Sequence, residues 1–548
     1  MNKQLPPMGS LWSMLAKPQK PGAKNLSLWK LLADPDAATP GGPYDPDRPC
    51  AVQFDERCVY WAMRNIPQKF ATENFLVCGI IGSGKTTVIQ LLLQSIARRF
   101  DSSRARPEQL IVFDAKGDAI PRLAALGHHP ANDNFWIMNP ADQRAATWNL
   151  GDAARTPLMA RQIAALLVPE EKNSSAPYFA NAAREITYAV ILGLDEIMRC
   201  NWSLRDLLCA LDSKEHILAI TSRQPRAKVI VDRIFADEKH AFGALSTLGT
   251  KLGPFEQVAA LWHSGRNRKR FSIPDFLSKP GVLVLGNDPA LSDSLWPINA
   301  ILLKALTQEI LRGEETQRPR HWFLLDEFPA MKRVDCIHDL LNLGRSKGAS
   351  VTLGLHGFEN LAEIYGENAA NIVFGQCAHK TFLRAGSPKT AEWAEKYFGK
   401  VRQVEMSESV ARGGPDRIVT QQFSVQERSA LMASTFLDLP LPAPGGSLAS
   451  INDVPSYQTA FLNSHSFDHV LSMCVPKSSG VPAFEPHADV KDQYLQPWSD
   501  DEKALFCGTT DDKGETPAPK PKPRRKASDL PTRPPRKPPT TSPDDSED

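Results

Sequence analysis

Residues 75–87 read Phe-Leu-Val-Cys-Gly-Ile-Ile-Gly-Ser-Gly-Lys-Thr-Thr. The apolar run Phe75–Cys78 is typical of a buried strand, and it stops at Gly79, where a glycine-rich loop begins. The loop leads into Val88–Arg99, whose apolar residues recur at helical spacing. The stretch therefore places the pattern G-x-x-x-x-G-K-T in the strand, loop and helix context that this pattern requires.

The residue types in this loop suit the binding of a polyphosphate. Gly79, Gly82 and Gly84 permit positive φ angles and let backbone N–H groups approach phosphates closely, and the helix N-terminus adds its dipole. Lys85 would lie against the β- and γ-phosphates, and the Thr86 hydroxyl would ligate Mg²⁺. The side chains predicted to line the site are Ser83, Lys85, Thr86 and Thr87. The loop thus predicts a site for ATP and Mg²⁺, and a chance match is the alternative.

The bulk composition is that of an ordinary globular protein. The chain has 548 residues, a formal net charge of +2 and 42% hydrophobic residues, which suffices for two or three domains with a large core. Since there is no basic excess, any contact with DNA must come from local patches. The nine cysteines form no metal-binding spacing, which favours buried thiols in a reduced compartment. With no apolar stretch of about eighteen residues and no recognisable signal peptide, a cytoplasmic protein without an integral membrane segment is expected.

The pattern of elements along the chain predicts an α/β fold with an all-helical insertion. Short β-prone runs alternate with helical stretches on both sides of a long region of purely helical periodicity, as in βαβ units around a mainly parallel, twisted sheet. Six segments follow from this: an irregular N-terminal arm (1–50), the first part of a nucleotide-binding domain (51–152), an all-helical inserted subdomain (153–275), the second part of the nucleotide-binding domain (276–400), an irregular C-terminal extension of the core (401–507) and a disordered Pro/Lys/Arg-rich tail (508–548).

Several polar positions carry more than one interpretation. Asp114 and Lys116 follow the strand-like run Gln109–Asp114, and ligands in such sheets gather at the carboxyl ends of strands. A polar residue that closes a strand is as often only a turn former, so both interpretations stay open for these two. The basic runs 266–270 and 520–526 suit phosphates, although a solvated loop and a solvated tail are the simpler explanations.

A partner for the glycine loop occurs far along the chain, in Trp322–Glu327. Here apolar residues end in Asp326 and Glu327. The carboxylate of Asp326 would hold the water shell of Mg²⁺, and Glu327 would orient and deprotonate the attacking water. We expect the two segments to lie on neighbouring strands. An apolar strand ending in Asp-Glu is weak evidence alone, but together with the loop it favours hydrolysis over nucleotide storage.

The ordered series of motifs resembles the coupling-protein ATPases of type IV secretion and conjugation, within the FtsK/HerA class of hexameric DNA motors. The matching stretches follow the family order over roughly 60–445: the glycine loop, Val112–Asp118, Asn139–Pro140 with Trp148–Asn149, Phe271–Phe276, Leu325–Phe328, Gly344–Gly348 with the following strand, and Tyr365–Gly366. The resemblance implies a RecA-like P-loop NTPase domain, and the helical insertion falls where the family carries its all-α domain.

The sequence departs from this family in two respects. Members of the family usually carry a pair of N-terminal membrane-spanning helices, and none is expected from residues 1–50. The strand after the Asp-Glu motif usually ends in a glutamine that senses the γ-phosphate, and His356 stands at the matching position. An imidazole can still donate one hydrogen bond, so sensing can survive, although a structural histidine at a strand end is the alternative. Ring motors of this class also take an arginine from the adjacent subunit, because charge develops on the transferred phosphoryl group. Arg384 and, secondarily, Arg345 are the candidates.

The leading hypothesis is a homohexameric, Mg²⁺- and ATP-dependent motor that grips DNA non-specifically through its phosphates. It would deliver DNA, or a nucleoprotein substrate such as a relaxase complex, to the proteins of a type IV secretion channel, and it would lie in the cytoplasm or at the periphery of the inner membrane. A soluble ATP-binding adaptor that recruits protein substrates is the second hypothesis. A cytosolic DNA motor unrelated to secretion is the third.

Overall fold

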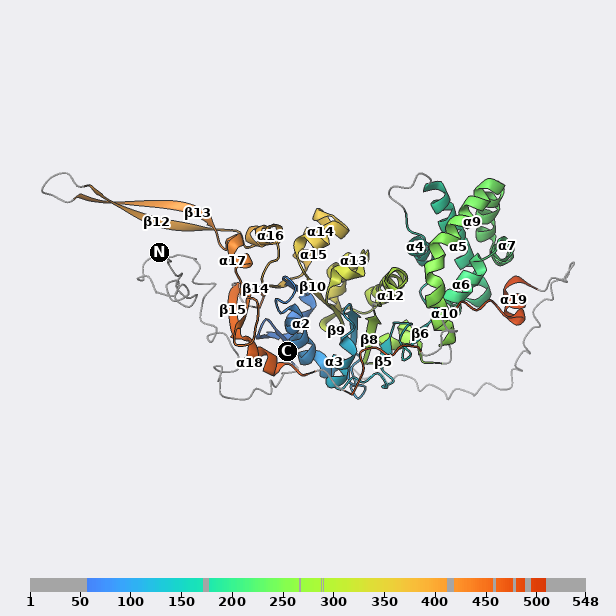
Figure 1. Ribbon diagram of the computed structural model, residues 1–548, viewed down its shortest axis with the longest axis horizontal. Helices are drawn as coiled ribbons and strands as arrows, with labels where there is room; N and C mark the ends of the chain where they lie inside the picture. The colour runs from blue at the N-terminus through green and yellow to red at the C-terminus, as the bar shows by residue number, and fades with distance from the viewer. Residues whose placement is uncertain are drawn as a thin grey trace, which may run out of the picture.

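The computed structural model describes residues 57–170, 177–265, 268–286, 288, 290–411, 418–456, 460–476, 480–487 and 494–508 (Figure 1). The predicted arm 1–50 and nearly all of the predicted tail 508–548 lie outside these residues. In the part of the chain that is described, no helix combines the length and apolar character needed to cross a bilayer.

A nine-stranded sheet forms the centre of the molecule, in the order β15-β14-β11-β3-β10-β9-β4-β8-β5. The seven strands from β11 to β5 run parallel, and β14 and β15 are antiparallel additions at one edge. Their bounds are β3 Phe75–Cys78, β4 Gln109–Asp114, β5 Phe135–Ile137, β8 Gly281–Gly286, β9 Thr316–Leu325, β10 Lys347–Leu355, β11 His379–Phe382, β14 Ser447–Asp453 and β15 Phe461–Ser466. The prediction of a parallel-dominated sheet is confirmed.

The parallel strands are apolar throughout because both faces of the sheet are covered. In β3, Phe75 and Val77 join the core on one face with the apolar side of α2, whereas Leu76 and Cys78 join the core on the other face. The helices on the two faces are α2 (Lys85–Ile96) and α3 (Ala119–Ala125) on the first, and α12 (Ser292–Arg312), α13 (Ile337–Leu343), α14 (Phe358–Tyr365), α15 (Glu367–Gln376) and α16 (Pro388–Phe398) on the second.

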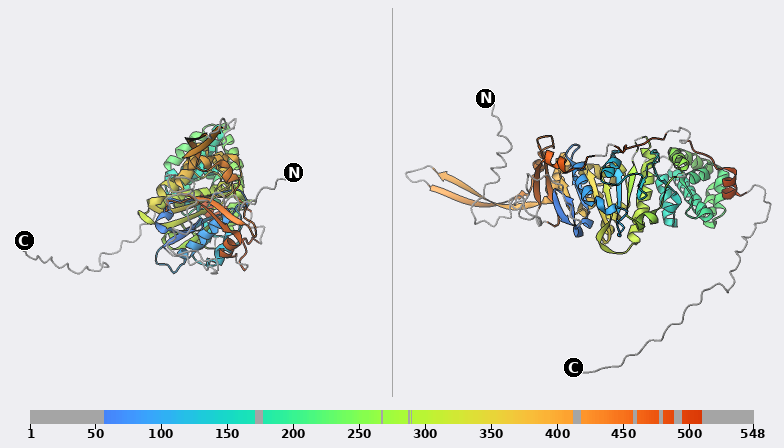
Figure 2. Two further views of the ribbon diagram at one scale, coloured as in Figure 1. Left: turned by 90° about the vertical axis from the view of Figure 1, so that its left-hand side faces the viewer. Right: turned by 90° about the horizontal axis from the view of Figure 1, so that it is seen from below.

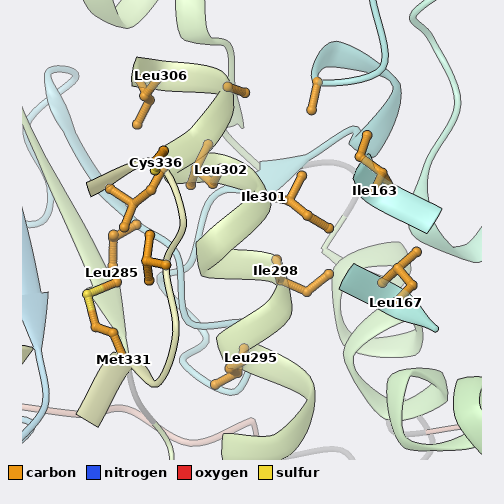
Figure 3. Close-up of a cluster of buried hydrophobic side chains, with 14 of the residues drawn as sticks. Ile163, Leu167, Leu285, Leu295, Ile298, Ile301, Leu302, Leu306, Met331 and Cys336 are labelled. Atoms are coloured by element: carbon orange, nitrogen blue, oxygen red, sulfur yellow. The ribbon is translucent and has the colours of Figure 1, made fainter. Parts of the chain in front are cut away.

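Helix α12 joins the sheet to the helical part of the chain. Its residues Leu302 and Leu306 lie toward Leu285 of β8, while Ile298 and Ile301 lie toward α4, as Figure 3 shows. The chain between β6 (Thr147–Trp148) and β7 (Arg270–Phe271) forms helices in all its described elements. These are α4 Pro157–Leu167, α5 Pro177–Met198, α6 Leu204–Leu211, α7 Lys214–Thr221, α8 Pro225–Phe235, α9 Glu238–Leu252 and α10 Glu256–Ser264.

The strands β6 and β7 pair in parallel, so the helical segment α4–α10 between them leaves and re-enters the sheet domain at one place. It lies at one end of the elongated molecule, beyond β5 (Figures 1 and 2). Its buried side chains form one continuous apolar cluster with α12 and one face of the sheet, so the helical segment extends the core without interrupting the ladder of the sheet.

The expectation of an irregular extension over 401–507 is wrong. Strands β12 (Lys400–Ala411) and β13 (Ile418–Ser429) form a long antiparallel hairpin that projects from the end of the molecule opposite the helices (Figure 1). Strands β14 and β15 then extend the central sheet, which is therefore not complete at residue 400. Sequence patterning missed these strands because a hairpin in solvent and strands at a sheet edge carry many polar residues and lack the apolar run of a central strand.

The end of the described chain forms a strap across the molecule. It passes β5, where Glu485 pairs with Arg144, and then packs Trp498 and α19 (Asp500–Cys507) on the helical segment. The buried Arg205 of α6 holds the strap, because it donates to the carbonyls of Gln496 and Pro497 at 2.7 and 2.6 Å and to both carboxylate oxygens of Glu502 at 2.9 and 3.0 Å. These hydrogen bonds keep the pKa of Glu502 at about 2, so the pair is ionised at neutral pH.

We expect Arg205→Met to release the strap. The variant leaves two carbonyls and a carboxylate without their donor. Gln496, Pro497 and Glu502 are in contact with solvent, so water can replace the donor, and three lost hydrogen bonds at the low end of about 0.5–1.5 kcal/mol each should reduce the docking free energy by roughly 2 kcal/mol. Hydrogen exchange of the amides in 494–508 should accelerate accordingly. Arg312→Met, which removes an exposed pair with Glu309, is the control and should leave exchange in this segment unchanged. Equal exchange in both variants would show that Arg205 does not hold the strap.

Candidate functional site

The glycine loop connects β3 to α2 at the carboxyl edge of the sheet. Gly82 and Gly84 have φ angles of +77° and +101°, which only glycine adopts without strain, and Gly84 is the residue before α2. A Cβ atom on Gly79 would lie 2.6 Å from the Ser83 hydroxyl and 2.7 Å from Leu383, so this position also has no room for a side chain. The Ser83 hydroxyl is buried and has no hydrogen-bond partner among the described residues. Thr87 lies in the first turn of α2.

Lys85 is buried inside this loop. Its ammonium donates to the carbonyls of Gly79 at 2.7 Å and Ile80 at 3.1 Å, and it contacts Nδ1 of His356 at 3.0 Å. Burial lowers the pKa of Lys85, although the negative charge of Asp326 opposes this shift. A cation held mainly by weak carbonyl dipoles in a poorly solvated loop favours an anion as its neighbour.

Thr86 and Asp326 meet across the sheet although 240 positions separate them. The Thr86 hydroxyl donates to Oδ2 of Asp326 at 3.1 Å. The expectation that their segments occupy neighbouring strands is wrong, because β10 lies between β3 and β9 and pairs with both. The two side chains still meet because Thr86 lies in the first turn of α2 and Asp326 directly follows β9, and both lie above the end of β10.

Gly354 in β10 makes this approach possible. A Cβ atom there would lie 2.7 Å from Oδ1 of Asp326 and 3.2 Å from its Cα atom. The sequence analysis did not select Gly354, although a single glycine inside an apolar strand is a signal that another group approaches the backbone closely. Oδ1 of Asp326 is itself buried and has no hydrogen-bond partner within the described part of the chain.

Lys116 places its ammonium among the same groups. Its Nζ atom lies 3.1 Å from the Thr86 hydroxyl, 3.4 Å from Oδ2 of Asp326 and 3.2 Å from Oε1 of Glu327. Partial burial alone would lower the pKa of Lys116, but the two carboxylates outweigh it and raise the pKa. Of the two interpretations left open for Lys116, the structure supports a position in the site.

Asp114 has a structural role, unlike Lys116. Its two carboxylate oxygens accept hydrogen bonds from the backbone N–H groups of Asp118 at 2.9 Å and Ala119 at 3.0 Å. Burial raises the pKa of this carboxyl, and the backbone donors counteract the shift. Asp114 therefore closes the turn that carries Lys116 into the site and begins α3.

Glu327 and His356 complete the cluster. Glu327 has a left-handed backbone with φ of +62°, unusual for a residue with a side chain, and it directly follows Asp326. His356, just past β10, lies with Nε2 3.3 Å from Oε1 of Glu327. Burial and the charge of Lys85 lower the pKa of His356, so the imidazole is neutral at neutral pH. Because an ammonium can only donate, Nδ1 accepts from Lys85, and Nε2 carries the proton toward Glu327.

The two arginines expected to act across a subunit boundary have other surroundings. Arg384 follows β11, and its carbonyl accepts from the N–H of Ile80 at 2.8 Å, so its main chain supports the glycine loop of its own chain. Its side chain makes no ion pair or hydrogen bond with another described residue. Arg345 pairs with Glu73 at 2.5 Å and is largely exposed. The structure thus does not bring either guanidinium into the cluster around Lys85.

The parallel sheet, the glycine loop before α2 and the Asp-Glu pair at the same rim define a RecA-like P-loop NTPase fold. Residues 58–460 match the family model of the type IV secretion-system coupling protein DNA-binding domain, and the chain belongs to this family. It is 25% identical over 395 residues to the coupling protein TraD of Escherichia coli (strain K12), which covers 69% of this chain and 52% of TraD. The chain therefore spans about half the length of that relative.

Solved structures of the bacterial conjugative coupling protein TrwB share the fold. The trigonal form with sulphate has a TM-score of 0.60 at 19% sequence identity and covers 79% of this chain and 92% of that chain. The complex of TrwB with ADP and Mg²⁺ has a TM-score of 0.59 at the same identity and coverage. The complex with a non-hydrolysable ATP analogue has a TM-score of 0.58, again at 19% identity, 79% of this chain and 92% of that chain.

Lys116→Met should increase the stabilisation that Mg²⁺ gives the protein. Without Lys116, Asp326 and Glu327 repel one another and leave the place beside Thr86 open to a divalent cation. Since Lys116 is partly exposed, the loss in stability without metal should be small, roughly 0.2–1 kcal/mol. Melting temperatures with and without Mg²⁺ test this, with Lys279→Met, an exposed lysine that pairs with Asp275, as the control. The same Mg²⁺-induced shift in all three proteins would contradict the assignment.

We expect any ATPase activity of the chain to survive His356→Gln and to be mostly lost in His356→Ala. A glutamine amide can accept from Lys85 and donate toward Glu327 as the neutral imidazole does, and alanine can do neither. Protonation of the wild-type imidazole would break its contact with Lys85. Because the pKa of His356 is lowered, the wild-type rate should fall only at a pH below the ordinary pKa of histidine. The His356→Gln variant should not show this fall in rate. Equal rates for His356→Ala and wild type would remove His356 from the mechanism.

Proposed function

We propose that the chain is a Mg²⁺-dependent P-loop ATPase. The observation that carries the proposal is the convergence of Thr86, Asp326 and Glu327 on the ammonium of Lys116. A hydroxyl and two carboxylates around one positive centre are a set of hard oxygen donors, which suits Mg²⁺, and the ammonium stands in for that ion. The buried Oδ1 of Asp326, with no partner in the described chain, is a further acceptor that this ion or its water shell would satisfy.

Each residue then has a separate task. Thr86 and Asp326 would hold Mg²⁺, which neutralises charge on the β- and γ-phosphates when bound. The backbone of Gly79, Gly82 and Gly84 would surround the phosphates, and Lys85 would exchange its carbonyl contacts for phosphate oxygens.

Glu327 would take a proton from the attacking water. His356 donates toward its Oε1 atom and accepts from Lys85, so it is placed to couple the base to the phosphate-binding lysine. Arg384 and Arg345 remain candidates for a cation supplied from a neighbouring subunit. Arg384 is the better of the two, because Arg345 already pairs with Glu73.

We further propose that hydrolysis drives movement of DNA in a conjugative or type IV secretion pathway. The family supports an interaction with DNA, because its model is that of a coupling-protein DNA-binding domain. TraD and TrwB are named as coupling proteins. The functional form would be a homohexamer that receives DNA or a relaxase-bound substrate and docks on channel proteins, as a peripheral component at the inner membrane.

Three proteins test the proposal: wild type, Lys85→Ala and Glu327→Gln. DNA should stimulate the ATPase rate of wild type severalfold. Lys85→Ala should abolish nucleotide binding and hydrolysis together. Glu327→Gln should bind ATP normally but lose roughly 10²- to 10⁴-fold in kcat, which is the usual contribution of a general base.

Light scattering of the same samples with and without DNA measures their molar mass and so tests for the proposed homohexamer. An ATPase rate that is slow and identical with and without DNA would favour the protein-recruiting adaptor instead. A DNA-stimulated rate with no retention of secretion-channel proteins would favour a DNA motor unrelated to secretion.

A further inference from the structure

A polar cavity lies at the amino-terminal edge of the sheet, opposite the proposed nucleotide site around Lys85 and Asp326. It has a volume of about 740 Å³, and it is bounded by the segment before β4 and the first half of β9. Within the described ranges its charged lining residues are six arginines and one glutamate: Arg57, Arg99, Arg104, Arg106, Glu108, Arg318 and Arg320. The whole chain has a formal net charge of only +2, so this arginine pocket concentrates positive charge that the chain as a whole does not have.

The one acid of the arginine pocket is already engaged. Glu108 lies 3.6 Å from the buried Arg99, and its other oxygen accepts from the indole N–H of Trp322 at 2.9 Å. The Arg99 guanidinium also lies over the Trp322 ring, 5.8 Å from the centroid. Burial raises the pKa of Glu108, and Arg99 opposes this shift. Glu108 thus anchors Arg99 and also attracts Arg104, and a single carboxylate cannot neutralise all the arginines at the rim of the pocket.

Three of those rim arginines have no carboxylate partner among the described residues: Arg106, Arg318 and Arg320. All three are exposed at the mouth of the arginine pocket. Like charges crowded in one cavity repel each other, and such an arrangement is stabilised by an anion that enters it.

The backbone around the arginine pocket is fixed rather than loose. Pro107 and the buried Pro319 restrict φ beside Arg106, Arg318 and Arg320. Gly348, with φ of +79°, lies at a register shift between β10 and β9, and a Cβ atom there would be 2.7 Å from the carbonyl oxygen of Arg318. Strand β10 pairs with Thr316 and then again from His321, so Arg318 and Arg320 lie in the intervening bulge of β9, and Gly348 leaves room for the backbone of this bulge to lie against β10.

We propose that the arginine pocket binds the phosphate backbone of nucleic acid, independently of sequence. Guanidinium groups match phosphate oxygens in bidentate geometry. The other lining residues are Gln68, Ala105, Pro107, Thr316 and Pro319, so the described part of the chain offers no aromatic face in this pocket on which a base could stack. A concave site also admits a flexible phosphodiester chain, whereas a flat lipid surface would reach only its rim. The inference deepens the proposed function, because it names a place where DNA is gripped away from the ATP site.

The test uses the full-length double variant Arg318→Gln/Arg320→Gln. Both side chains are exposed and lack carboxylate partners among the described residues, so the fold should persist. The control is Arg312→Gln/Arg333→Gln, which removes the same charge from two exposed arginines that pair with nearby acids. Anisotropy of labelled duplexes of two unrelated sequences, without nucleotide and over a salt series, gives Kd and its salt dependence.

The pocket variant should bind both duplexes about 10-fold more weakly, with a slope of log K against log salt reduced by about 1–2, since each lost phosphate contact removes about 0.9. The control should resemble wild type. Unlabelled tripolyphosphate should displace DNA from wild type more readily than from the pocket variant. Unchanged DNA affinity of the pocket variant would overturn the inference, as would a selective loss of binding to phosphatidylglycerol vesicles with DNA binding intact.

The ATPase rate without DNA separates the two proposals. The pocket variant should keep this basal rate, because Arg318 and Arg320 lie at the opposite edge of the sheet from Lys85 and Glu327. Weakened DNA binding by a protein that hydrolyses no ATP would overturn the proposed ATPase but support the pocket. Normal DNA binding together with DNA-stimulated hydrolysis in the pocket variant would support the proposed ATPase and overturn the assignment of DNA binding to the arginine pocket.

Discussion

Two carboxylates, a hydroxyl and an ammonium share one small volume at the carboxyl edge of the sheet. Asp326 and Glu327 would repel one another there without a cation, and Lys116 supplies that charge. The arrangement requires three segments that are distant in sequence to end at the same height. The parallel register of β3, β10, β9 and β4 meets this requirement, since their carboxyl ends all face the same rim.

Because the parallel pairing of β9 with β10 brings Asp326 close to the end of β10, the site is tightly packed and its backbone is strained. Gly354 is needed where Asp326 crosses the end of β10, and Glu327 adopts a left-handed backbone immediately after the strand. Strained residues of this kind persist where the surrounding structure holds them in place, and they cluster at functional sites. His356 then links Lys85 to Glu327, so the loop that would receive phosphate and the carboxylate that would act on water are mechanically connected.

A parallel sheet also has an opposite rim, and here the two rims differ in charge. The carboxyl edge carries paired acids and lysines, whereas the amino edge carries the arginine pocket with its single engaged glutamate. Because helices cover both faces of the parallel sheet, its two rims are the places where strand ends such as the first half of β9 meet solvent. A protein that handles both a nucleotide and a polyanion can therefore separate the two activities on one sheet.

The sequence by itself determined the elements whose signal is local. The glycine loop, the apolar strands that flank it and the helical periodicity of 153–275 follow from the order of residue types, and so does the presence of an acidic pair after Trp322–Leu325. The parallel-dominated sheet was predicted correctly on that basis, and the RecA-like fold was predicted correctly from the resemblance to the coupling-protein family. Only the tertiary structure decided which distant groups meet: that β10 separates the two halves of the site, that Lys116 rather than Asp114 enters it, and that 447–466 extends the sheet. The physical reason is that strand order and edge pairing depend on non-local packing, and a period-two or polar edge pattern carries little information about its partner.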